Sequence, residues 1–237
     1  MEEIKQRMTS YWTRRVEQFS ALRYKELQGE KHQQWLAELQ ARLPATTGLD
    51  ILDIGTGTGF FALLLGAQGH RVTGIDLTPD MVAEARRMAQ RLGVEAEFAV
   101  MDAEQPSFPP HSFDAIVTRN LTWTLPHLPQ AYACWHTLLK PGGVLINFDG
   151  DYCREKPYEA PAHHAHQGMG EELMEEYQKM KRALRPTQQP RPQWDVELLR
   201  QAGFSEIQVD TGVWKRIYDR VDEFYNPTPI FAMTARA

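Results

Sequence analysis

The sequence has only two cysteines, Cys134 and Cys153, and no long apolar run. Two cysteines cannot form a disulfide framework, and their scarcity favours a reducing compartment. The most apolar run, residues 60–65, is far shorter than the roughly 20 residues of a membrane-spanning helix. The first residues also lack the apolar segment of a secretory signal. We therefore expect a cytoplasmic protein without a membrane partner.

Acidic residues outnumber basic ones. The 237 residues include 26 Lys and Arg and 31 Asp and Glu, which gives a formal net charge of −5. This balance argues against a protein that binds nucleic acid through bulk positive charge. Hydrophobic residues make up 42% of the chain, which is enough for the core of one large domain. The composition is therefore that of a globular protein rather than of a disordered chain.

Strand patterns and helix patterns alternate along most of the chain. Short apolar runs closed by glycine predict buried strands, and apolar residues three or four apart predict helices. The predicted strands cover residues 49–54, 72–75, 97–100, 115–118, 144–148, 207–209 and 230–234. The predicted helices cover residues 4–16, 35–43, 60–65, 129–139, 173–184 and 193–202, and a further helix begins after Thr78. This alternation predicts an α/β fold, with a mostly parallel sheet covered by helices on both faces.

Five prolines between residues 151 and 192 interrupt the alternation. We interpret residues 151–192 as a helical lid that is inserted over the carboxyl edge of the sheet. Residues 1–44 are expected to form an N-terminal helical cap, and residues 45–150 the core. Residues 193–237 are expected to complete the same sheet.

A glycine-rich loop follows the first predicted strand. Residues 53–59 read DIGTGTG and join that strand to a helix. Glycine permits a tight turn and lets a ligand approach the backbone, while the helix start offers unpaired N–H groups. Asp76 stands seventeen residues after Gly59, at the end of the second strand. An acidic side chain at that place can accept hydrogen bonds from both ribose hydroxyls of an adenosine, so the pattern predicts a nucleoside site.

Two kinds of nucleoside ligand compete for this loop. The dinucleotide fingerprint has Gly or Ala at the position where this chain has Phe60, because the helix must pack closely there. A site for S-adenosylmethionine has no pyrophosphate to hold and tolerates Gly-x-Gly-x-Gly. It also tends to place a carboxylate two residues before the first glycine, where Asp53 stands and can face an ammonium group. The loop therefore favours S-adenosylmethionine.

Several segments together resemble the successive motifs of class I S-adenosylmethionine-dependent methyltransferases. Among these enzymes, the motifs most resemble those of the small-molecule, quinone-biosynthesis-like branch, also called type 11. The segments are residues 51–59, Asp76, residues 101–104 (MDAE), residues 113–117 (FDAIV) and residues 138–143 (LLKPGG). The resemblance is close over residues 45–150. It implies a Rossmann-like sheet of seven strands with the last strand antiparallel, and an enzyme that uses S-adenosylmethionine and releases S-adenosylhomocysteine.

The resemblance also implies which residues hold the cofactor. The backbone of the glycine loop would enclose the methionine part, and Asp76 would hold the ribose. Asp102 would bond the adenine amine, and Tyr11 would reach the cofactor carboxylate. The full predicted set is Tyr11, Asp53, Gly55, Thr56, Gly57, Gly59, Asp76, Leu77, Met81, Asp102, Ala103, Glu104 and Asn120.

The methyl acceptor is expected where the fourth and fifth strands end, because ligands of open α/β sheets bind at the carboxyl edge. Trp123, Asp149 and Asp151 follow these strands and are candidates for substrate binding. Asn120, Asp149 and His163 are candidates for catalysis, although the sequence does not single out one base. A base is needed only if the acceptor atom arrives protonated.

His163 belongs to a cluster with His164 and His166 in the predicted lid. Such a cluster supplies a base, or it is a solvated loop. No second pair of ligands with a recognised spacing accompanies it, so we predict no metal site.

Three function classes stay open at this stage. The main hypothesis is methyl transfer to an N, O, S or C atom of a small molecule, by a monomer or homodimer. Alternatives are a module that binds S-adenosylmethionine without turnover, and a nicotinamide-dependent oxidoreductase. A nucleic-acid acceptor is disfavoured, because residues 119–122 read RNLT rather than the Asn-Pro-Pro-aromatic arrangement of many DNA amino-methyltransferases.

Overall fold

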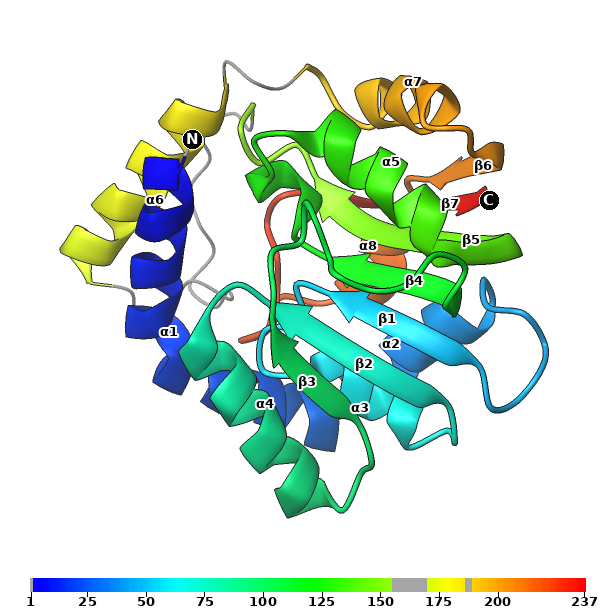
Figure 1. Ribbon diagram of the computed structural model, residues 1–237. Coiled ribbons are helices and arrows are strands. Elements are labelled where there is room, and N and C mark those ends of the chain that lie inside the picture. The colour runs from blue at the N-terminus through cyan, green and yellow to red at the C-terminus, as the bar shows by residue number, and fades with distance from the viewer. Residues whose placement is uncertain (1, 155–169, 186–188) are drawn as a thin grey trace.

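The computed structural model describes residues 2–154, 170–185 and 189–237, which form one sheet with helices on both faces (Figure 1). The strands are β1 Asp50–Ile54, β2 Arg71–Asp76, β3 Glu97–Val100, β4 Phe113–Arg119, β5 Leu139–Gly150, β6 Ser205–Asp210 and β7 Ile230–Arg236. The helices are α1 Glu2–Gln28, α2 Lys31–Gln40, α3 Phe60–Gly66, α4 Pro79–Leu92, the short 3₁₀ helix η1 Thr122–Thr124, α5 Leu128–Leu138, α6 Glu171–Leu184, α7 Gln193–Gln201 and α8 Val213–Ile217.

The seven strands lie in the order β3-β2-β1-β4-β5-β7-β6. Strands β1 to β5 pair in parallel, whereas β7 runs antiparallel to both β5 and β6. The predicted α/β fold with an antiparallel last strand is thereby confirmed. The chain leaves β1 toward β2 on one side, while β4 pairs with β1 on the other. Ligands of open α/β sheets bind in the crevice at such a reversal of strand order.

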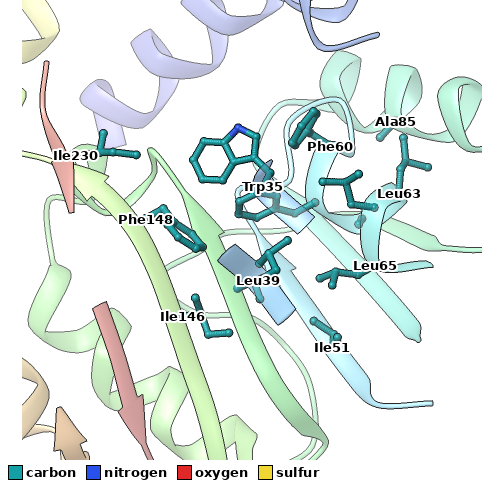
Figure 2. Packing of buried hydrophobic residues seen from close by; sticks show 14 of the residues in the cluster. Trp35, Leu39, Ile51, Phe60, Leu63, Leu65, Ala85, Ile146, Phe148 and Ile230 are labelled. Carbon is teal, nitrogen blue, oxygen red and sulfur yellow. The ribbon is translucent and has the colours of Figure 1, made fainter. Parts of the chain in front are cut away.

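Side chains of the central strands alternate between two hydrophobic layers. Ile51 points to the layer that also contains α2 and α3, and Leu52 points to the layer of α5 and α7. Trp35 of α2 is fully buried in the first layer, near Phe148 (Figure 2). Its ring is edge-on to those of Phe61 and Phe148, at centroid distances of 5.4 and 5.3 Å. A buried tryptophan at this place fixes α2 against the sheet.

Helix α1 is 27 residues long and lies beside α4 and α6 at one end of the molecule (Figure 1). Polar contacts hold it there: Thr13 donates to Asp80 of α4 at 2.8 Å, and Arg7 donates to Glu176 of α6. Charged residues recur along α1, and no helix in the described parts of the chain is both long and apolar enough to cross a membrane. The middle of the predicted lid, residues 155–169, lies outside the described residues.

Asp149 at the end of β5 is fully buried, which corrects the expectation that it contacts a substrate. Its carboxylate accepts hydrogen bonds from the Thr122 hydroxyl, from Trp123 N at 3.0 Å and from Gly150 N at 2.7 Å. Arg191 lies 3.4 Å from the same carboxylate and is also fully buried. Asp149 therefore holds η1 against the sheet, and its lone pairs are used by the protein itself.

A second carboxylate shares the Arg191 guanidinium. Asp195 of α7 pairs with Arg191 and also accepts a hydrogen bond from the Tyr132 hydroxyl at 2.6 Å. Because these groups have no access to water, an unpaired charge among them is costly.

We expect Arg191→Leu to lower the free energy of unfolding by about 3–5 kcal/mol, because two buried carboxylates lose their cation. Urea denaturation measures the change. The matched control is Arg200→Leu, which removes an exposed arginine of α7 and should change stability by less than about 0.5 kcal/mol. Equal stability of the two variants would contradict a role for Arg191 in holding this region together.

Candidate functional site

A cavity lies at the carboxyl ends of β1, β2 and β4 and is covered by α1. The glycine loop forms one side of it, and residues from α1, η1 and the segment after α8 form the others. The strand order reverses at this place, so the cavity occupies the position that the topology predicts for a ligand.

The three glycines of the loop have different reasons to lack a side chain. All have left-handed backbones, with φ of 70° at Gly55, 55° at Gly57 and 89° at Gly59. A Cβ at Gly57 would lie 3.3 Å from Phe19 Cε1, and one at Gly55 would lie 2.8 Å from Leu121 Cδ1. A Cβ at Gly59 would lie 3.2 Å from Phe98. Gly57 and Gly55 thus keep the cavity side of the loop bare, whereas Gly59 lets α3 pack closely.

Asp53, near the end of β1, anchors the glycine loop through hydrogen bonds and also lines the cavity. Its carboxylate accepts hydrogen bonds from Thr56 Oγ1 at 2.6 Å and from Ala62 N at 3.1 Å. Burial raises the pKa of Asp53 to about 7, although both hydrogen bonds act in the opposite direction. A cation in the cavity would therefore be well placed to stabilise the ionised carboxylate.

Asp76 at the end of β2 holds the loop from the other side. Its carboxylate accepts hydrogen bonds from Gly57 N at 3.0 Å and from Thr78 N at 2.9 Å, and it lines the cavity. Burial raises the pKa of this carboxyl group as well. A carboxylate oxygen has two lone pairs, so Asp76 can accept further hydrogen bonds from a ligand.

Asn120, directly after β4, has a left-handed backbone with φ of 55°. Asparagine tolerates this conformation better than most residues do. Its N–H donates to Phe148 O at 2.8 Å, and its Oδ1 accepts a hydrogen bond from the Tyr152 hydroxyl at 2.8 Å. Asn226 in turn donates to Tyr152 at 2.7 Å. Burial holds the pKa of Tyr152 well above its ordinary value, so this hydroxyl stays protonated.

Arginine side chains reach the cavity from α1 and β4. Arg23 and Arg119 share the buried carboxylate of Glu26, and Arg119 lies 4.0 Å above the Trp35 ring. Together the two guanidinium groups lower the pKa of Glu26 in spite of its burial. Arg15, about two turns before Arg23 on α1, also lines the cavity.

The opposite side of the cavity is aromatic. The Trp123 ring lies 5.3 Å from Tyr152 and 5.7 Å from Tyr177 between centroids. Tyr177 comes from α6, and its ring also stacks on Tyr11 of α1 at a centroid distance of 6.0 Å. Tyr11 therefore packs behind the cavity surface, and its neighbour Trp12 lines the cavity in its place.

The structure brings most of the predicted loop residues to the cavity and leaves others away from it. The predicted residues that line it are Asp53, Gly55, Thr56, Gly57, Asp76, Met81, Asn120 and Trp123. Those absent from its described lining are Tyr11, Gly59, Leu77, Asp102, Ala103, Glu104, Asp149 and Asp151. His163, His164 and His166 lie outside the described residues.

Internal contacts occupy the predicted residues that follow β3. Asp102 pairs with Lys5 at 2.7 Å, and Ala103 O accepts a hydrogen bond from Trp135 Nε1. The Glu104 carboxylate accepts a hydrogen bond from His127 N at 2.5 Å. Asp102 keeps about a third of its side chain exposed, so of these three residues it has the side chain most free to meet a ligand.

Asp151 accepts a hydrogen bond from Arg191 N at 3.3 Å, and burial raises its pKa. Within the described parts of the chain, no group of three or more His, Cys, Asp or Glu side chains is placed to hold a metal ion.

Sequence reasoning missed the cavity residues of α1. Arg15, Phe19 and Arg23 recur every four residues after Tyr11, so all four face the same side of the helix. Arginines on an otherwise aromatic helix face were the available signal, because a buried guanidinium needs an anionic partner.

Part of the chain is similar in sequence to known methyltransferases. Residues 51–143 match the family model described as "Methyltransferase domain". The demethylmenaquinone methyltransferase of Thermus thermophilus is 39% identical over 98 residues, which is 40% of this chain and 44% of that protein. The ubiquinone biosynthesis O-methyltransferase of Xylella fastidiosa strain 9a5c is 37% identical over 117 residues, 46% of this chain and 44% of that protein. The chain thus spans less than half the length of these curated relatives.

Likeness in three dimensions covers more of the chain. The crystal structure of a SAM-dependent methyltransferase from Aquifex aeolicus superposes with a TM-score of 0.59, over 90% of this chain and 95% of the other, at 18% identity. At that identity the likeness concerns the fold. Residues 51–143 are therefore similar to the methyltransferase domain family, and the chain has the fold of that S-adenosylmethionine-dependent methyltransferase.

Proposed function

We propose that this protein transfers a methyl group from S-adenosylmethionine to a small-molecule acceptor. The observation that carries the proposal is the glycine loop, which the carboxylates of buried Asp53 and half-buried Asp76 hold beside a covered cavity. Gly57 keeps the backbone bare where an added Cβ would lie only 3.3 Å from Phe19, a residue of the cavity wall. The residues present thus fit the cofactor of this domain family.

The proposed cofactor lies along the loop. Asp76 accepts hydrogen bonds from the ribose hydroxyls. Leu77 and Met81 pack on the adenine, and Asp102 bonds the adenine amine. Asp53 faces the methionine ammonium, and Asn120 lies near the sulfonium. This placement is supported by the lining of the cavity, in which Asp53, Asp76, Met81 and Asn120 all take part.

The bound cofactor supplies an electrophilic methyl group whose C–S bond breaks as the bond to the acceptor atom forms, and the electron pair goes to sulfur. The protein's part is to align the acceptor and to exclude water. Trp123 and Tyr152 present aromatic surfaces beside Asn120, and such surfaces attract a sulfonium cation. Asn120 and His163 stay our proposed catalytic residues, and Asp149 is withdrawn because it is fully buried in internal contacts.

We propose a quinone-like or other small aromatic acceptor rather than a nucleic acid, supported by the named relatives and by the net charge of −5. A cytoplasmic location and a monomeric or homodimeric state belong to the same proposal.

The alternatives are a module that binds S-adenosylmethionine without turnover and a nicotinamide-dependent oxidoreductase. Phe60 opposes the oxidoreductase, because a dinucleotide site has Gly or Ala at this position. Here the Phe60 ring lines the cavity, with its centroid 4.9 Å from the Arg119 guanidinium carbon.

The proposal predicts that S-adenosylhomocysteine accumulates when the protein is incubated with S-adenosylmethionine and a panel of small phenols, thiols, amines and acids. Liquid chromatography of the nucleoside product is the measurement, and Asp76→Ala is the inactive control. S-Adenosylmethionine binding without product from any acceptor would favour the binding module. Oxidation of NADH by the protein would favour the oxidoreductase.

Cofactor affinity should depend on pH through Asp53. In the free protein burial holds its pKa at about 7, against about 4 in an unfolded chain. The native state thus holds the extra proton between these values. The group's contribution to stability is complete below about pH 4 and is lost as the pH rises through about 7.

An ammonium group beside Asp53 favours the ionised form, so binding releases this proton. We expect the affinity for S-adenosylhomocysteine to rise from pH 6 to pH 8, by at most about 10-fold per unit. Titration calorimetry in two buffers of different ionisation enthalpy measures both the affinity and the proton release. Asp53→Asn should bind more weakly and release no proton near pH 7. An unchanged pH dependence in that variant would assign the proton to another group.

A further inference from the structure

Arg15 is a buried cation for which the described protein supplies no anion. Its side chain lies on the cavity face of α1, and the residue is only 4% exposed. Its Nε has no hydrogen-bond partner, and no described residue forms an ion pair with its guanidinium. Burial of an ionised group without a partner is unfavourable, so a group of this kind is typical of a binding site.

The other two buried arginines show the usual arrangement. Arg23 is paired with Glu26, and Arg191 is paired with Asp149 and Asp195. Each has a buried carboxylate that offsets the loss of hydration. Arg15 differs from them in that no described carboxylate pairs with it, and it lines a cavity where a ligand can supply one.

The neighbours of Arg15 on its face of α1, Tyr11 and Phe19, are aromatic. One turn earlier on α1, Tyr11 stacks on Tyr177, and Tyr177 lies against Trp123. The charge of Arg15 acts on Tyr11, where it opposes the rise in pKa that burial causes. Arg23 and Glu26, by contrast, lie toward Arg119 and Trp35. Arg15, Asn120 and Trp123 line the same cavity, and we place the acceptor among them.

We propose that Arg15 binds a carboxylate group of the methyl acceptor, so that the acceptor is a planar, aromatic carboxylic acid. This inference rests on the proposed function. The planar fork of a guanidinium matches both oxygens of a carboxylate, and the rings of Trp123, Tyr152 and Tyr177 offer flat apolar surface to an aromatic body. Arg15 determines specificity and does not touch the reacting atoms.

The test uses acids and their neutral amides as probes: benzoate with benzamide, and 2-naphthoate with 2-naphthamide. With the full-length protein saturated with S-adenosylhomocysteine, we expect at least one acid to bind about 10-fold or more tightly than its amide, since a charge-assisted pair is worth this much. Arg15→Met should abolish the preference, and Arg15→Lys should retain part of it. Arg14→Met, which removes an exposed arginine of the same helix paired with Glu172, is the matched control.

Two further readouts separate this role from others. Without an acid, Arg15→Met should melt at the same or a higher temperature than the wild type, because an uncompensated buried charge is removed; a lower melting temperature would indicate a structural role. S-Adenosylhomocysteine should bind Arg15→Met within about 2-fold of the wild type.

If the variant loses cofactor affinity instead, Arg15 holds the cofactor carboxylate, and the inference is overturned. It is equally overturned if no acid is preferred over its amide while S-adenosylhomocysteine binds. Absence of S-adenosylhomocysteine binding to the wild type would contradict the proposed function itself.

Discussion

Hydrogen bonds that the glycine loop donates to the carboxylates of Asp53 and Asp76 fix its shape, and the rest of the site is arranged around that loop. Asp53 accepts from Thr56, and Asp76 accepts from Gly57. These carboxylates stand at the ends of neighbouring parallel strands, whose register pairs Asp53 with Gly74. Asp53 belongs to β1 and Asp76 to β2, so the pairing of these strands sets the distance between the two carboxylates that hold the loop.

Helix α1 completes the site by covering the loop. Phe19 lies over Gly57, and Glu26 near the end of the helix pairs with Arg119 of β4. Since Glu26 and Arg119 are both largely removed from water, their pairing offsets two charges that would each be costly alone. The same helix that closes the cavity thus also brings charged groups to it.

The sheet, the loop and its two carboxylates could be predicted from the sequence, because their signals are local. An apolar strand, a glycine-rich turn and a helix are adjacent in the chain, and Asp76 ends the next strand. Asp149 was placed wrongly because its partners are distant in sequence: Thr122 comes 27 residues earlier and Arg191 comes 42 residues later. No spacing rule shows that such groups meet.

The sequence did not indicate which residues of α1 line the cavity, and the cause is different. Each residue turns a helix by about 100°, so the choice between Tyr11 and Trp12 depends on how the helix is rotated against α4 and α6. Only packing settles that rotation, and it brings Trp12 to the cavity and Tyr11 against Tyr177. Asn226, which donates a hydrogen bond to Tyr152, could not be predicted either, because the two residues are 74 positions apart and share no pattern.

The most direct test of the central claim is a calorimetric titration of S-adenosylhomocysteine into Gly57→Ala and Gly69→Ala. Both glycines have left-handed backbones, with φ of 55° and 81°, so both variants should lose about 1–2 kcal/mol of stability. Only at Gly57 does the new Cβ meet a cavity residue, Phe19, while at Gly69 it meets nothing within 4 Å. We predict that Gly57→Ala binds about 10-fold or more weakly than the wild type and that Gly69→Ala binds normally. Equal affinities in the two variants would contradict the placement of the cofactor on the glycine loop.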